Sequence, residues 1–185
     1  MSIVSTGKRA RTGRPEPGEY ADYAGPDIAA VPGDDAIEAL ERVRHETTAL
    51  FRLLAEPCGR GATYAPGKWT LKQVLGHLVD DERIFAYRLL CVARAEPLAL
   101  PGFDENLYAA HAEHERCALE DLIEEYDVTR AATLVLLRGL PPDAWARRGH
   151  VNGYECSVRG LAFHIAGHEL HHHRIVRERY LPTIG

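Results

Sequence analysis

The chain has 185 residues, of which 45% are hydrophobic and 26% are charged, and its formal net charge is −5. These values are typical of one globular domain that buries a core without disulfide or metal cross-links. The charge is negative and no Lys/Arg cluster follows an aromatic pattern, which argues against a nucleic-acid-binding surface. No stretch approaches the ~20 apolar residues of a membrane span, so we expect no membrane-embedded helix.

The four cysteines, Cys58, Cys91, Cys117 and Cys156, stand far apart and form no C-x-x-C motif. Scattered cysteines in a chain of this size are typical of reduced thiols in a cytoplasmic protein. The basic residues near the N-terminus have no apolar run behind them, so no signal peptide is predicted. We therefore expect a cytoplasmic location.

The first part of the chain carries no strong helical pattern. Residues 1–18 are rich in Gly, Pro, Ser and Arg, which predicts a flexible N-terminal tail. Residues 19–33 contain two tyrosines and two prolines and are expected to form an extended segment laid on the domain. A single domain is predicted over residues 19–185.

Four segments repeat apolar residues at steps of three and four, the spacing of one face of an α-helix. They cover residues 34–56, 70 to about 94, about 115–139 and 157 to about 180. Asp34 or Asp35 is placed to cap the first of these helices.

Two connections, at 97–114 and 140–156, are long enough to cross over the end of a bundle. Asp104 is placed to cap a short helix in the first, and the second is predicted to be a loop or a brief hairpin. The sequence therefore predicts an all-α protein, a four-helix bundle with long crossover loops.

The last predicted helix is dense in histidine, with five in the ten positions 164–173. On the core-facing side of this helix, residues recur at steps of four and three. This core-facing seam contains aliphatic residues together with His168 and His172. His164 and His171 flank the seam, and His173 is predicted to point away from it. Imidazoles at i and i+4 lie about 5–6 Å apart at Cβ, so His168 and His172 can bind one metal ion. A hydrogen-bonded structural pair and a pH-sensitive patch are the alternatives.

A third metal ligand has to come from another helix. His77 follows Val74 by three residues, at the edge of the second helix's apolar stripe, where it can face inward. Together with the pair on the last helix, it is the best candidate for the third ligand. The remaining histidines are predicted to lie at the surface or in a loop: His45, His111, His114 and His150.

Three acidic residues, Asp80, Asp81 and Glu82, follow His77 within a turn and a half. A solvated acidic face is the simplest interpretation. Asp81, four residues after His77, is the best placed to serve instead as a carboxylate that orients a ligand or transfers a proton.

Residues 168–172, HELHH, also match the H-E-x-x-H motif of zinc proteases, in which Glu169 would be the general base. The residues after His172 contain neither the glycine turn nor the third histidine of the extended motif, and no cleft-lining strands are predicted. Glu169 lies one step off the His168 seam, so it is expected to face solvent or a neighbouring helix. A protease is therefore disfavoured.

Three stretches together resemble the DinB-like superfamily, which includes the YfiT-type proteins and thiol-dependent transferases: "GKWTLKQVLGHLVDDERIFAYRLL", "PGFDEN" and "HIAGHELHHHRIVRERY". The resemblance covers about residues 35–180. It implies a four-helix bundle, often dimeric, in which three histidines hold a divalent ion, commonly zinc or nickel. Carried over residue by residue, that site falls on His77, His168 and His172, the set already reached from helical periodicity.

The resemblance leaves the reaction open. Some relatives transfer a low-molecular-weight thiol, and others are described as metal-dependent hydrolases. Three imidazoles leave an open coordination position on the metal, so the sequence predicts a metal-dependent transferase that acts on a small molecule with such a thiol. A metal-dependent hydrolase and a non-catalytic, stress-related bundle with a vestigial metal site are the alternatives. A homodimer is expected, with Phe85, Tyr87 or Tyr108 supplying aromatic area.

Overall fold

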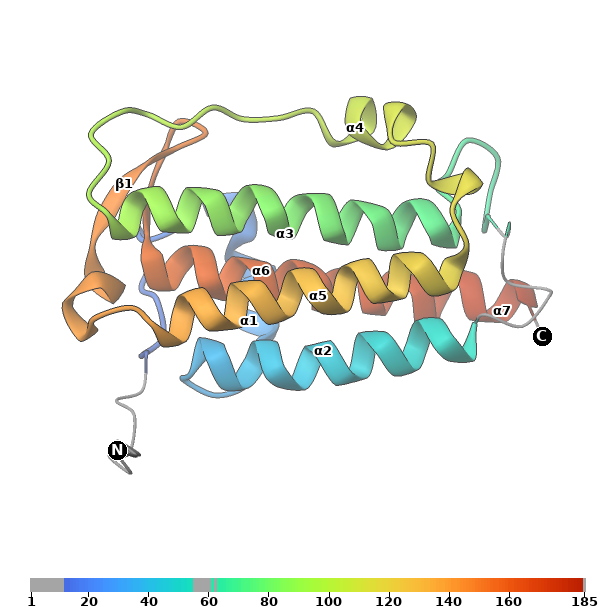
Figure 1. The fold of residues 1–185 in the computed structure, drawn as a ribbon, viewed down its shortest axis with the longest axis horizontal. Coiled ribbons are helices and arrows are strands. Elements are labelled where there is room, and N and C mark those ends of the chain that lie inside the picture. The colour runs from blue at the N-terminus through green and yellow to red at the C-terminus, as the bar shows by residue number, and fades with distance from the viewer. Residues whose placement is uncertain (1–11, 55–60, 62, 185) are drawn as a thin grey trace, which may run out of the picture.

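A computed structural model describes residues 12–54, 61 and 63–184. Four long helices lie side by side (Figure 1): α2 (Ala36–Leu53), α3 (Leu71–Ala93), α5 (Leu119–Arg138) and α6 (Val158–Ile175). After α6 the chain continues through a π-helical turn (Val176–Tyr180) into α7 (Leu181–Ile184). The predicted all-α four-helix bundle is confirmed.

Side-chain caps fix where three of these helices begin. Asp35 accepts hydrogen bonds from two backbone N–H groups at the start of α2, and Ser157 does so from one at the start of α6. Thr70 and Gln73 form a capping box, in which each side chain accepts a hydrogen bond from the other residue's backbone N–H. The capping box fixes the first turn of α3.

Within the described residues, the connection between α3 and α5 crosses over the bundle. After α3 the chain runs back along the length of that helix, through α4 (Glu105–His111) and a 3-10 turn (His114–Arg116), before α5 begins (Figure 1). Consequently α3 and α5 run parallel and pack against each other. In addition, α3 packs against α6, and α5 packs against α2. The predicted cap at Asp104 is present, and it accepts hydrogen bonds from Asn106 and Leu107 N–H. The connection at 97–114 thus crosses the bundle as predicted.

The connection between α5 and α6 stays at one end of the bundle. It contains a 3-10 turn (Pro142–Ala146) and a two-stranded antiparallel hairpin of β1 (Arg148–Val151) and β2 (Tyr154–Ser157). Residues 140–156 were predicted to form a loop or a brief hairpin, and the hairpin is observed. This connection does not cross over the bundle, although it is long enough to do so. Leu100 of the crossover hydrogen-bonds to the outer side of β1, which ties the two connections together.

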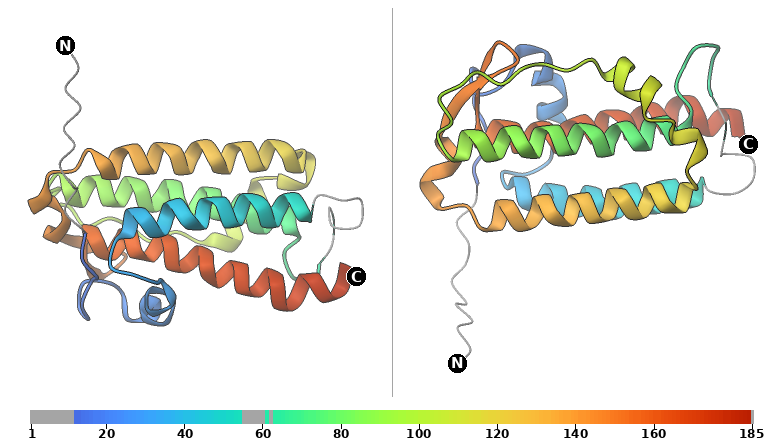
Figure 2. Two further views of the ribbon diagram at one scale, coloured as in Figure 1. Left: turned by 90° about the horizontal axis from the view of Figure 1, so that it is seen from below. Right: turned by 45° about the horizontal axis from the view of Figure 1, so that its top comes forward.

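The N-terminal segment packs on α6 (Figure 2). It contains a 3-10 turn (Asp22–Ala24) and α1 (Gly25–Ala30), so the predicted extended segment is laid on the domain but is largely helical. Residues 12–18 also make specific contacts: Arg14 donates to the carbonyl oxygens of Ile28, Val31 and Gly33 at 2.6–2.7 Å. The predicted flexible tail therefore does not extend to residue 18, and residues 1–11 lie outside the described part.

The apolar interior is divided into two clusters, one near the hairpin end and one near the opposite end. On every long helix, buried polar residues lie between the two: Thr47 on α2, Asp81 and Glu82 on α3, Arg130 and Thr133 on α5, and Glu169, His172 and His173 on α6. We call this set the central polar layer. Buried polar groups require partners, so the middle of the bundle is where function is to be sought.

Cys91, Cys117 and Cys156 are free thiols, and Cys58 lies outside the described residues. No helix in the described ranges is both long and apolar enough to cross a membrane.

Candidate metal centre

The three histidines singled out from the sequence come together between α3 and α6. His77 is the seventh residue of α3, and His168 and His172 stand one turn apart on α6. The Nε2 atom of His168 lies 3.2 Å from Nε2 of His77 and 3.2 Å from Nε2 of His172. All three donor atoms are within 4.8 Å of one another.

This spacing suits a metal ion. Two nitrogens bound to one zinc ion at about 2.0–2.1 Å, with a tetrahedral angle between them, lie roughly 3.3 Å apart. The two Nε2 distances of 3.2 Å are close to that separation. The three imidazoles could therefore hold a divalent ion, which would still have room for a further ligand.

A buried carboxylate orients the central histidine. Asp81 Oδ2 lies 3.2 Å from His168 Nδ1, so His168 donates from Nδ1 and turns the lone pair of Nε2 toward the other two imidazoles. Burial alone would raise the pKa of Asp81, but the charge and hydrogen bond of His168 lower it to about 2. Asp81 thus orients one of the three candidate ligands, as the sequence suggested, but it contacts His168 and not His77.

Burial keeps two of the three imidazoles neutral. It lowers the pKa of His77 to about 4, with a further lowering from His168, and it lowers the pKa of His172 well below its usual value. For His168 burial acts in the same direction, but Asp81 outweighs it and the pKa is raised. Neutral imidazole is the form that binds a metal ion, so His77 and His172 are ready to do so.

The carboxylates near the site are not on a solvated face. Asp81 and Glu82 are buried, so the interpretation as a solvated acidic face is wrong for these two, whereas Asp80 is partly exposed. Glu169 is also buried and binds Arg130 and Tyr126 of α5. Glu169 was predicted to face solvent or a neighbouring helix, and it faces the neighbouring helix α5. Because Glu169 is held there, it does not serve as the base of an H-E-x-x-H protease.

The other histidines are buried, partly exposed or exposed, and His171 is the partly exposed one. His164 is buried, stacked on Phe85 at 4.1 Å between ring centroids, and burial lowers its pKa to about 4. His173 was predicted to point away from the seam, but it is buried with Nε2 2.5 Å from the Thr47 hydroxyl oxygen. His114 was expected at the surface, but it is buried. The three that are exposed as predicted are His45, His111 and His150.

Gly76 explains the burial of His114. A Cβ atom at residue 76 would stand 2.2 Å from the His114 ring, so the imidazole packs directly on the α3 backbone. The sequence feature that could have indicated the burial of His114 is therefore Gly76, because a glycine inside a helical pattern often indicates close approach of another group.

A cavity of about 240 Å³ opens beside the histidines. His172 and Trp69 line it, and the Trp69 ring lies 4.8 Å from the His77 ring and 6.4 Å from that of His172, between centroids. Its other walls come from the segment before α3, from the first turn of α3, from α4, and from the end of α6 with the π-helical turn: Tyr64, Gly67, Lys68, Val74, Glu105, Asn106, Ile175 and Tyr180. Sequence periodicity did not identify this cavity, because much of its wall lies outside the long helices.

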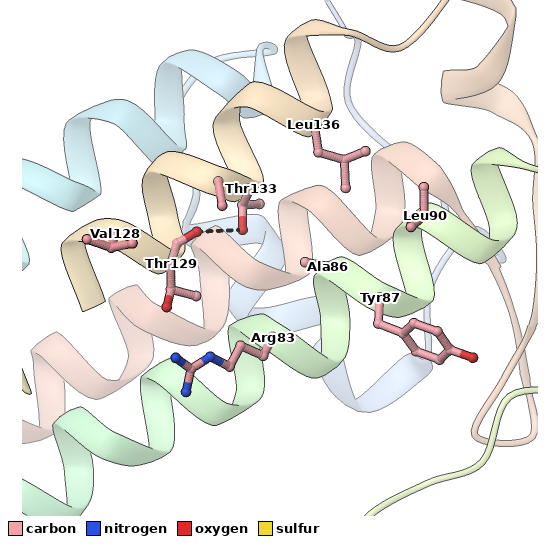
Figure 3. Close-up of a pocket in the computed structure, with 9 residues that line it drawn as sticks. Arg83, Ala86, Tyr87, Leu90, Val128, Thr129, Thr133 and Leu136 are labelled. Atoms are coloured by element: carbon pink, nitrogen blue, oxygen red, sulfur yellow. Dashed lines mark hydrogen bonds between the residues drawn. The ribbon is translucent and has the colours of Figure 1, made fainter. Parts of the chain in front are cut away.

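A second cavity, of about 430 Å³, lies in the groove between α3 and α5 (Figure 3). Its lining contains apolar side chains, two threonines and Arg83, and no histidine. It is therefore separate from the histidine cluster.

Comparison with known proteins identifies the family. Among solved structures, YfiT from Bacillus subtilis, described as "a probable metal-dependent hydrolase with an unusual four-helix bundle topology", is similar with a TM-score of 0.64 and 19% identity. The match covers 77% of this chain and 84% of that one. No curated protein sequence matches. A sequence model described as the DinB superfamily matches residues 39–176, which is most of the chain. The protein therefore belongs to the DinB superfamily.

Proposed function

We propose that the protein is a metal-dependent enzyme that transfers a low-molecular-weight thiol to a small electrophilic molecule. The observation that carries the proposal is the convergence of three imidazole Nε2 atoms within 4.8 Å beside a cavity. His77, His168 and His172 would hold the ion, and zinc or nickel suits an all-imidazole donor set.

The ion, when bound, supplies an open coordination position at which the pKa of a bound thiol or water is lowered. A free thiol has a pKa of about 8.5 and free water one of about 15.7, so a thiol ionises there with a smaller shift. The two carboxylates that adjoin His168, in contact or in sequence, are already engaged, Asp81 by His168 and Glu169 by Arg130. A nucleophile that needs no separate base therefore fits this site best.

The thiol has to arrive with a co-substrate. No cysteine is among the described residues that line the cavity. In the reaction, the thiol sulfur forms a bond to the acceptor carbon, the acceptor's leaving group departs with the bonding electrons, and the thiol proton is released. Trp69 and Tyr180 offer aromatic walls against which the organic part of the acceptor can pack.

Hydrolysis is the second candidate, and the likeness to YfiT supports it. The same three histidines would serve, with water in place of the thiol. Glu105, which lines the cavity, is the carboxylate best placed to take up a proton from water there.

The test uses the metal-loaded protein, purified without a histidine tag. Transfer of cysteine, 2-mercaptoethanol and other small thiols to an aromatic electrophile with a chloride leaving group is measured, together with ester hydrolysis without thiol. We expect turnover that requires both metal and thiol. It should persist in a matched variant in which all four cysteines are replaced by serine.

Three other outcomes would distinguish a cysteine nucleophile, a hydrolase and a non-catalytic bundle. Transfer that is lost in the cysteine-free variant, while its fold and metal content are retained, contradicts the proposal and indicates a cysteine nucleophile. Metal-dependent hydrolysis without thiol supports the second candidate. Metal binding without either activity indicates a non-catalytic bundle.

A further inference from the structure

Arg130 lies at the centre of the bundle and touches all three neighbouring long helices. It belongs to α5 and is 1% exposed. Its Nε donates to Glu82 Oε1 on α3 at 2.8 Å, its Nη2 donates to Glu169 Oε2 on α6, and its Nη1 donates to the Leu40 carbonyl oxygen on α2 at 3.0 Å. One side chain thus connects four helices.

The two carboxylates that it holds are sequence neighbours of the site residues. Glu82 directly follows Asp81, and Glu169 directly follows His168, while Asp81 and His168 bind each other at 3.2 Å. Successive residues on an α-helix are about 100° apart. Each pair, Asp81–Glu82 and His168–Glu169, therefore presents one side chain to the histidine cluster and the next one to Arg130.

The rest of the central polar layer supports the same arrangement. The Tyr126 hydroxyl donates to Glu169, and the Thr47 hydroxyl contacts both Glu169 and His173 Nε2. Glu169 is thereby fixed from α2 and α5 at once. A rotation or sliding of α6 that displaced His168 would also break these contacts.

A buried ion-pair network of this kind need not add net stability. Desolvation offsets much of the attraction in a buried ion pair, and apolar side chains of similar size often stabilise a core as well or better. What a planar guanidinium between two carboxylates provides is fixed direction and distance. Those are the properties that a metal site requires of its ligands.

We propose that Arg130 is a positioning residue for the metal centre: by holding Glu82 and Glu169, it sets the rotation and register of α3 and α6 that bring His168 to His77. This proposal rests on the metal-binding part of the proposed function. It does not depend on which reaction the enzyme catalyses.

The test compares metal affinity and coordination in folded variants. Arg130→Met/Glu82→Gln/Glu169→Gln removes all three charges and leaves amide acceptors for Tyr126 and Thr47. Arg130→Lys keeps the charge and loses the two-sided geometry. Arg138→Met is the matched control, because Arg138 is on the same helix and binds Glu41 on the exposed surface. Co²⁺ is titrated into each metal-free protein, and affinity and the visible absorption bands, which report coordination geometry, are recorded with circular dichroism and thermal unfolding.

We expect the triple variant to remain helical and to unfold cooperatively. Its Co²⁺ affinity should fall about tenfold or more, as it does when other residues that support metal ligands are replaced. Its visible absorption bands should change as well. Arg130→Lys should show a smaller loss, and Arg138→Met none. A folded Arg130 variant with the Co²⁺ affinity and spectrum of the wild type would overturn the proposal. Failure of both variants to fold would also overturn it, because Arg130 would then serve stability alone. If the wild-type protein itself binds no Co²⁺, the metal site fails first, and that result is distinct.

Discussion

At the scale of single residues, the histidines on α6 differ because their surroundings differ. His168 turns Nε2 toward Nε2 of both His77 and His172, whereas His173, the residue after His172, turns Nε2 toward Thr47. His171 is partly exposed and has Nδ1 3.2 Å from Asp27 Oδ1 on α1. Neighbouring imidazoles therefore have separate partners, and only one pair on this helix belongs to the candidate metal centre.

Metal content should depend on His77, His168 and His172 together. Alanine at any one removes a direct donor, so affinity for Zn²⁺ should fall by more than the 10- to 100-fold that loss of an outer partner causes. His111→Ala is the control, because His111 is exposed. His173→Ala is unsuitable as a control, since His173 is buried against Thr47. Metal analysis and competition with a chromophoric chelator measure the effect, and equal affinity in wild type and His77→Ala would exclude the three-ligand site.

Helical periodicity was sufficient to select the three clustered histidines but not to describe the central polar layer. Spacing shows which residues share a face of a helix. It does not show whether a neighbouring segment covers the flank of that face. Glu82, Glu169 and His173 lie on such flanks, and they are buried because Arg130 and Thr47 of other helices meet them there.

At the scale of elements, the N-terminal segment fits α6 through two glycines. A Cβ atom at Gly160 would lie 2.1 Å from the Glu19 carbonyl oxygen, and one at Gly167 would lie 2.5 Å from that of Asp27. Backbone therefore packs directly on backbone at both positions. The segment before residue 39 is outside the part matched by the family model, yet it supplies Asp27, the partner of His171.

Gly167→Ala should destabilise the protein, although alanine normally favours a helix over glycine by about 1 kcal/mol. The added methyl group has to displace the Asp27 backbone, and such overpacking costs about 1–3 kcal/mol. Gly139→Ala is the matched control, because its new Cβ atom would meet only ordinary contacts at 3.5 Å. Urea unfolding of the metal-free proteins gives the free energies. A Gly167→Ala variant as stable as Gly139→Ala would show that the segment does not pack tightly on α6.

At the scale of the whole molecule, the order and approximate bounds of the helices followed from the sequence, because each long helix has a continuous apolar stripe and three of them have side-chain caps. The parallel arrangement of α3 and α5 did not. It depends on the crossover running the length of α3, where Arg88 donates to the Pro101 carbonyl oxygen at 2.6 Å. Such a contact between distant residues leaves no periodic signal.

The groove between α3 and α5 is the surface on which association of two copies can be examined (Figure 3). Of the three aromatic residues suggested for an interface, Phe85 is buried against His164 and Tyr108 lines a different cavity. Tyr87 remains, 59% exposed at the groove, and Val128 on the opposite wall is 61% exposed. Apolar side chains gathered at a groove are typical of interaction surfaces.

We expect the protein to form a homodimer through this groove. A two-fold contact uses the same patch on both copies, so one substitution changes the interface twice. Light scattering at micromolar concentration should give about twice the chain mass of 20.6 kDa for the wild type, and a mass near that of one chain for Tyr87→Glu, because association would then have to remove two added carboxylates from water. Leu53→Glu on α2 is the control, since Leu53 is 70% exposed but lies outside the groove. A dimer that survives Tyr87→Glu would place the interface elsewhere, and a wild-type protein of single-chain mass would exclude the dimer itself.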